Sequence, residues 1–163
     1  MIETLIKSKK RVGELGEVFT PSWLVEEILD HLPEKLFEDP SRPFIDPMCG
    51  NGNFLSAVVK RKIANGLSPQ QALETTYGID IMLDNILECR QRLTKIVITA
   101  MNSSVDHSSP EIGKDILLMV ENNIRHGDTL KFELEDIFSD EPSEELINFR
   151  NEKQDFITLD STG

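Results

Sequence analysis

The first half of the chain alternates between helical and extended patterns of hydrophobic residues. After Thr20 and Pro21, which suit the N-cap and first position of a helix, apolar residues recur at helical spacing. Residues 43–47 form a short apolar run that stops at Asp46 and predict a buried strand. A glycine-rich turn follows, and a second helical pattern covers residues 53–65.

The rest of the chain continues this alternation. The elements expected there are a short helix opened by Ser68 and Pro69, a strand at 77–81, a helix at 83–100, a helix at 110–119, a strand at 123–128, a helix at 143–150 and a strand at 155–159. Strands separated by helices need crossover connections, so they pair in a mainly parallel sheet with helices on both faces. The predicted fold class is therefore α/β.

The length and charge fit one domain with an acidic C-terminal end. The 163 residues are divided into an N-terminal helical part, 1–38, and an alternating core, 43–163. The net charge is −12, and residues 111–163 hold 14 acidic and 5 basic side chains, a net of −9. Contact with nucleic acid must therefore be local. Two basic clusters occur, one of Lys7, Lys9, Lys10 and Arg11, and one of Lys60, Arg61 and Lys62. We expect each of them to be a solvated helix face or a frayed tail.

Two cysteines, Cys49 and Cys89, occur without a Cys-x-x-Cys motif or a Cys/His cluster. We therefore expect reduced thiols and no metal site, as is typical of a reducing compartment. No apolar stretch approaches the roughly 20 residues that cross a bilayer, and residues 1–11 lack the apolar core of a secretion signal. The chain is accordingly predicted to be cytoplasmic, without a membrane partner.

Acidic residues stand at the ends of three predicted strands. Asp46 opens the sequence Asp-Pro-Met-Cys-Gly-Asn-Gly-Asn, Asp80 lies near the end of the second strand, and Asp128 ends the third. Ligands of open parallel sheets bind outside the carboxyl ends of the strands, so these acids are expected to share one site. Each alone is more commonly a cap or turn residue, but the three together favour binding.

The ligand predicted from these acids is S-adenosylmethionine. A dinucleotide fingerprint needs a third glycine where this chain has Leu55, and Asp46 would repel a pyrophosphate. S-adenosylmethionine instead offers an ammonium group, a ribose diol and an adenine amino group, each of which can donate to a carboxylate. A nucleotide-dependent dehydrogenase is therefore the least favoured alternative.

Four sequence motifs occur in order along the chain. They are Gly-Glu-Val-Phe-Thr-Pro at 16–21, Asp-Pro-Met-Cys-Gly-Asn-Gly-Asn-Phe-Leu at 46–55, Tyr-Gly-Ile-Asp-Ile at 77–81 and Gly-Asp-Thr-Leu at 127–130. Together they resemble the S-adenosylmethionine-dependent adenine-N6 DNA methyltransferases of bacterial and phage restriction-modification systems. The resemblance implies a partial Rossmann-like methyltransferase fold, a single truncated cofactor-binding domain, and DNA as partner of the complete enzyme.

The resemblance also implies a role for each matching residue. Asp46 would accept from the cofactor's ammonium group, Asp80 from its ribose hydroxyls and Asp128 from its adenine amino group. Ile81 would pack on the adenine ring, and the segment 19–21 would close over the cofactor. The full set expected to contact S-adenosylmethionine is Phe19, Thr20, Pro21, Asp46, Met48, Gly50, Gly52, Asp80, Ile81, Asp128 and Leu130.

The fourth predicted strand departs from the family. There the family has Asn or Asp followed by Pro-Pro and an aromatic residue, a loop that holds a flipped adenine in line with the methyl group. Asp160 takes the first position and is the catalytic candidate, but Ser-Thr-Gly follows it. We therefore expect that this chain alone neither methylates DNA nor binds it specifically.

Two functions stay open at this point. The chain is either part of a truncated or split adenine methyltransferase, or a non-catalytic module for cofactor binding or interaction. In both cases the fold lacks strands that the family has, which predicts an exposed edge or apolar face. Self-association or pairing with a downstream polypeptide is the expected consequence.

Overall fold

The structure is a computed structural model of the 163-residue chain, in which residues 4–103 and 110–131 are described. The chain divides into two compact units, Met1–Thr129 and Leu130–Gly163. The architecture below is that of the first unit. The helix expected at 143–150, the strand expected at 155–159 and Asp160 lie outside the described residues.

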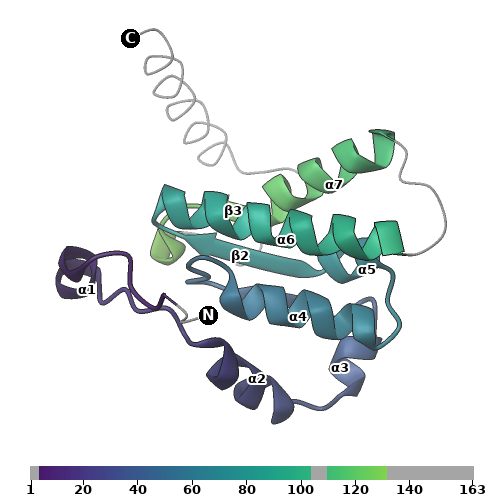
Figure 1. Ribbon diagram of the computed structural model, residues 1–163, viewed down its shortest axis with the longest axis horizontal. Coiled ribbons are helices and arrows are strands. Elements are labelled where there is room, and N and C mark those ends of the chain that lie inside the picture. Colours follow the sequence, from purple (N-terminus) through teal and green to yellow (C-terminus); the bar gives the residue numbers. More distant parts are fainter. Residues whose placement is uncertain (1–3, 104–109, 132–163) are drawn as a thin grey trace, which may run out of the picture. The chain divides into compact units, whose positions relative to one another are not determined.

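Three short strands form a parallel sheet with β2 in the centre (Figure 1). The strands are β1 (Phe44–Asp46), β2 (Thr76–Asp80) and β3 (Ile124–His126). Asp46 pairs with Gly78, and Asp80 pairs with His126, so the carboxyl ends of all three strands lie at one end of the sheet. The parallel pairing and the three strand positions, which are within two residues of those expected, confirm the α/β prediction for this part of the chain.

Helices in the connections pack against one another and against the sheet. They are α4 (Asn53–Ala64), α5 (Pro69–Glu74), α6 (Leu83–Ser103) and α7 (Pro110–Asn123). Figure 1 shows α4 and α6 running side by side along the sheet. Helices on the second face stay a prediction. Among the described helices, none is both long and apolar enough to cross a bilayer.

The predicted end of α7 at Met119 is too early, because the buried positions continue. Ile116 and Val120, one helical turn apart, both pack into the main apolar cluster. The helix therefore runs on to Asn123, where β3 begins directly. The short helix α5 begins as expected: Ser68 forms a capping box with Gln71, in which each side chain bonds the other's backbone.

The N-terminal part contains three short helices, α1 (Lys9–Leu15), α2 (Ser22–Asp30) and α3 (Lys35–Glu38). The expectation of Thr20 as N-cap of α2 is wrong by one residue. Pro21 occupies that position with an extended backbone and no side-chain cap. The Thr20 carbonyl instead accepts a hydrogen bond from Asn53 Nδ2 at 2.9 Å.

The expectation of a frayed basic tail is also wrong, because residues 9–15 form a capped helix. The Ser8 hydroxyl accepts from the Arg11 N–H at 3.1 Å, and Gly16 ends α1 with a φ of 66°. Both cap residues were visible in the sequence. Lys9 and Lys10 are exposed on α1, as expected of a solvated helix face, whereas Arg11 is ion-paired, as described below.

Helix α4 lies between two apolar clusters and organises the unit. Leu55 and Val59 pack toward α6 and α7, whereas Ala57 and Val58 pack toward α2 and α3. Because both sides of α4 are covered, the expectation of a solvated helix face at 60–62 is wrong for Lys62, which is fully buried. Its ammonium group donates to Thr75 Oγ1 at 2.7 Å, the Thr75 carbonyl at 3.1 Å and the Arg42 carbonyl at 3.3 Å.

Candidate functional site

The turn between β1 and α4 has a shape that glycine alone fits. Gly50 and Gly52 have φ values of 51° and 81°, in the left-handed region. A Cβ atom on Gly52 would lie 2.5 Å from Cys89 Sγ, and one on Gly50 would lie 3.2 Å from the Phe19 ring. The turn is therefore pressed between α6 on one side and the N-terminal motif on the other.

Asp80, at the carboxyl end of β2, holds this turn by hydrogen bonds. Its Oδ2 accepts from the Gly50 N–H at 2.9 Å. Its Oδ1 accepts from the Met82 N–H at 2.8 Å and from Asn85 Nδ2 at 3.3 Å. Each carboxylate oxygen has two lone pairs, so the group can still accept from a ligand hydroxyl.

Asp46, at the end of β1, is held in a different electrostatic state. Burial raises the pKa of its carboxyl above the usual range, and the nearby charge of Asp80 raises it further. The hydrogen bond that Asp46 Oδ1 accepts from the Met48 N–H at 3.1 Å acts in the opposite direction. A cationic group beside Asp46 would therefore be stabilising, because it would offset the burial and the neighbouring charge that disfavour the ionised carboxyl.

The turn after β3 contacts the turns that follow β1 and β2. The Gly127 N–H donates to the Asp80 carbonyl at 3.0 Å, and the Thr129 hydroxyl donates to the Pro47 carbonyl. Asp128, between these two contacts, is half-buried. The structure thus brings Asp46, Asp80 and Asp128 to the same end of the sheet, although they are far apart in sequence.

The N-terminal motif packs against this end. Phe19 is buried with its ring against Gly50, and its N–H donates to the Leu5 carbonyl at 2.8 Å. Thr20 meets the first residue of α4 through the bond to Asn53 described above. Pro21 starts α2. Of the expected contact residues, those at 19–21 therefore lie beside the turn rather than apart from it.

Three expected contact residues are apolar and exposed. Met48 is 80% exposed, Ile81 is 55% exposed and Leu130 is 94% exposed. Met48 follows β1 and Ile81 follows β2, so both stand at the carboxyl end of the sheet. Leu130 is the first residue of the second unit.

A polar network that the sequence analysis missed connects the N-terminal motif with Asp80. Asn85 Nδ2 donates to Glu17 Oε2 at 3.0 Å as well as to Asp80. Glu17 in turn pairs with Arg11 at 2.5 Å, and Arg11 pairs with Asp84 at 2.6 Å. The hydrogen bond from Arg11, helped by Lys7, lowers the pKa of Asp84 to about 2. The available signal was Asn85 itself, a polar residue on the apolar side of α6.

Both cysteines are free and lie beneath the turn, as expected for reduced thiols. A hydrogen bond with Cys89 and burial raise the pKa of the Cys49 thiol. Its Sγ lies 3.8 Å from the Gly50 carbonyl, in the geometry of a weak S–H donor. Both thiols therefore act as small core side chains under the glycine turn.

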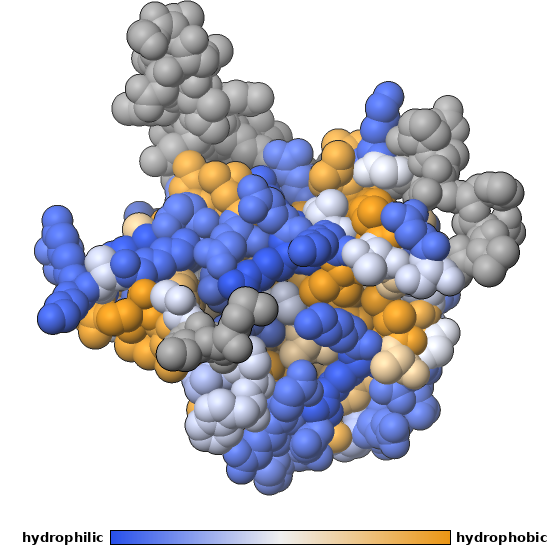
Figure 2. Space-filling view, in the orientation of Figure 1, coloured by the Kyte–Doolittle hydropathy of each residue, from blue (hydrophilic) through white to orange (hydrophobic). Residues whose placement is uncertain are grey.

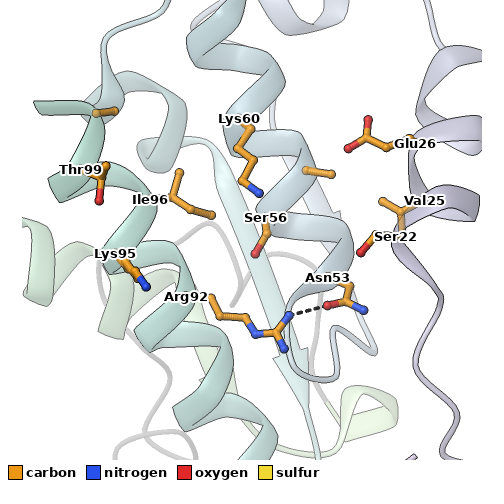
Figure 3. Close-up of a pocket in the computed structure, with 12 residues that line it drawn as sticks. Ser22, Val25, Glu26, Asn53, Ser56, Lys60, Arg92, Lys95, Ile96 and Thr99 are labelled. Atoms are coloured by element: carbon orange, nitrogen blue, oxygen red, sulfur yellow. Dashed lines mark hydrogen bonds between the residues drawn. The ribbon is translucent and has the colours of Figure 1, made fainter. Parts of the chain in front are cut away.

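A pocket of about 560 Å³ lies elsewhere, on the helical side of the unit between α2, α4 and α6 (Figure 3). Its lining includes Ser56, Lys60, Arg92 and Lys95, none of which the sequence analysis selected for a ligand. No protein family, no curated protein and no solved structure matches the chain. The functional argument therefore depends on the geometry and on the sequence motifs.

Proposed function

We propose that this chain is the S-adenosylmethionine-binding part of a site-specific DNA methyltransferase that acts on the N6 amine of adenine. The observation that supports the proposal most is the hydrogen bond between Asp80 and the Gly50 N–H. It joins two of the family-like motifs at the carboxyl end of a parallel sheet, which is where ligands of such sheets bind. Phe19 of a third motif packs on the same glycine.

The residues at the strand ends fit this cofactor in charge and shape. An ammonium group beside Asp46 would relieve the repulsion and desolvation that raise the pKa of that carboxyl. Asp80 has free acceptor capacity for ribose hydroxyls, and Ile81 offers an exposed apolar surface for an adenine ring. The absence of Cβ atoms lets Gly50 and Gly52 pack directly on Phe19 and Cys89, which fixes the main chain of the turn at the strand ends. When bound, S-adenosylmethionine supplies an electrophilic methyl group on a sulfonium.

The substrate and the catalytic step follow from the resemblance to the family. Asp160 would accept a hydrogen bond from the target N6 amine and so leave the nitrogen lone pair free to attack. We further propose that the observed α/β architecture is part of a Rossmann-like methyltransferase fold with helices on both faces. In this proposal the complete enzyme binds DNA, the chain associates with a second copy or with a further polypeptide, and the protein is cytoplasmic.

Calorimetric titration with S-adenosylhomocysteine and S-adenosylmethionine tests the proposal. The wild-type chain should bind both, and Asp80→Ala should weaken binding by about 1 to 3 kcal/mol, because ribose hydroxyls lose their acceptor. Asp39→Ala is the matched control: that carboxylate bonds Ser41 in a loop before β1, so binding should be unchanged. The proposal fails if millimolar ligand produces neither heat nor a thermal shift. Binding of NAD in place of either ligand would support the dehydrogenase.

A further inference from the structure

The pocket on the helical side is built from matching stripes on three helices. Positions 53, 56, 57 and 60 of α4 form one helical stripe, and positions 92, 95, 96, 99 and 100 of α6 form another. Positions 22, 25 and 26 of α2 complete the wall. Figure 2 shows apolar surface between polar side chains where α4 and α6 run side by side. None of these positions contributes to the acidic site at the strand ends except Asn53, which borders both.

The charged groups of the pocket are mostly positive. Lys60 and Lys95 are exposed and have no ion-pair partner among the described residues. Arg92 is shared between Asn53 Oδ1 at 2.5 Å and Glu88 at 2.6 Å. Figure 3 shows Arg92 reaching from α6 to Asn53 of α4, with Lys60 further along the same side of α4. The acidic residue in the lining is Glu26 on α2, and its carboxylate forms an ion pair with Arg61 at 2.6 Å.

Ser56 supplies an independent sign of a missing partner. Ser56 is 8% exposed, lies between Lys60 and Asn53 on the pocket side of α4, and its hydroxyl has no hydrogen-bond partner among the described residues. A buried hydroxyl without a partner is costly, so it favours a ligand oxygen as the missing partner.

We propose that this pocket binds an organic phosphate monoester with an apolar body. Two unpaired ammonium groups match the charge of about −2 that a phosphate monoester carries at neutral pH. Val25, Ala57 and Ile96 provide apolar wall for the body, and the volume is in the range of small-molecule sites. The cationic cofactor proposed for the strand ends does not fit here, because Lys60 and Lys95 repel it. The pocket is therefore a second site for a ligand of opposite charge.

Fluorescence titration with 1-naphthyl phosphate tests the proposal. Two comparison compounds share the naphthyl ring: 1-naphthalenesulfonate carries one negative charge, and 1-naphthol carries none. The phosphate should bind about tenfold more tightly than the sulfonate, because it engages both lysines. The double variant Lys60→Gln/Lys95→Gln should remove about tenfold of that affinity, and Ser56→Ala should remove about threefold. Both lysines are exposed, so the double variant should unfold at the wild-type temperature.

The controls separate this site from surface charge and from the strand-end site. Lys10→Gln/Lys114→Gln removes the same charge from exposed positions on α1 and α7, and should leave binding unchanged. Asp46→Asn should also leave it unchanged, because asparagine keeps the acceptor for the Met48 N–H and so keeps the turn. The proposal is overturned if the lysine double variant binds the phosphate like wild type, or if naphthol or the sulfonate binds equally well. Lysine-dependent binding of duplex DNA without binding of the phosphate would overturn it too.

Discussion

The two candidate sites of this chain are built in opposite ways. At the strand ends, Asp46 and Asp80 surround a turn whose shape depends on left-handed glycines, so the geometry is set by the main chain. In the helix pocket, Lys60 and Lys95 project from regular helices, so the charge sits on long side chains. One site is acidic and rigid, and the other is basic and adjustable.

This difference predicts how each site responds to substitution. A change in the glycine turn alters the packing of β1, α4 and α6 together, so folding and binding should fail together. A change at a pocket lysine alters charge on an exposed side chain, so binding should change while folding does not.

Gly52→Ala should destabilise the fold by about 2 to 5 kcal/mol, the sum of a left-handed alanine and an overpacked contact. The new Cβ would lie 2.5 Å from Cys89 Sγ and 3.2 Å from Cys89 Cα. Gly66→Ala is the matched control, because its φ is 97° but no atom lies within 4 Å of the added Cβ. It should show the backbone strain alone. Urea unfolding of both variants measures the difference.

The contact with Cys89 can be tested separately. Cys89→Ala in the Gly52→Ala background removes the nearest sulfur, so it should recover part of the lost stability. The backbone atoms of residue 89 remain close, so recovery should not be complete. Equal losses in Gly52→Ala and Gly66→Ala would show that close packing of the turn is not what fixes this site.

Lys62 tests whether every cation on α4 is available to a ligand. Burial lowers the pKa of its ammonium group from 10.5 to about 8. The unfolded chain therefore holds the proton more tightly between these pH values, and stability rises with pH through that window, by at most about 3 kcal/mol. The rise is measured as the difference in unfolding free energy between the wild-type chain and Lys62→Met, determined at pH 7.5 and again at pH 10.5. Lys60→Met, on the exposed part of the same helix, should remove none of it.

A difference that stays constant with pH would mean that Lys62 remains fully charged in the fold. Its three short contacts with carbonyl and hydroxyl oxygens would then outweigh its burial. The distinction between a structural lysine at 62 and a ligand-binding lysine at 60 would survive, but without the pH signature.

The gathering of the three acids at one end of the sheet was predictable from sequence, because each acid follows a predicted strand and parallel strands end together. The apolar signal is clear for β1 and β2, whereas β3, Ile-Arg-His, holds one apolar residue. The pocket was not predictable, because its residues lie on three helices whose relative rotation is set by core packing. Lys60 and Lys62 are two residues apart and therefore lie on opposite sides of α4; Lys62 falls on the buried stripe with Leu55, Val58 and Val59, a signal that the sequence analysis missed. Asn85 was missed because its partners come from three separate segments.

Asp46→Asn should give the smallest change in stability, and the change should be a gain. A carboxylate whose removal stabilises the fold is expected of a binding group rather than of a structural one. Because the pKa of Asp46 is raised in the fold, its contribution to stability is present at low pH and is lost as the pH rises through the raised value. Asparagine keeps an acceptor for the Met48 N–H without the charge. The variant should therefore be slightly more stable than wild type at pH 7, and this gain should disappear below pH 3.8, the ordinary pKa of the group.

The same variant should bind S-adenosylmethionine about tenfold more weakly, because the ammonium group loses a charged acceptor. Asp84→Asn is the matched control with the opposite sign. Its pKa is held at about 2 by Arg11, so losing that charge should lower stability at pH 7 and leave cofactor binding unchanged. A charge that weakens the fold but strengthens binding is characteristic of a ligand site. If Asp46→Asn instead lowers stability and leaves binding unchanged, Asp46 is a structural turn residue and the acidic site reduces to Asp80 and Asp128.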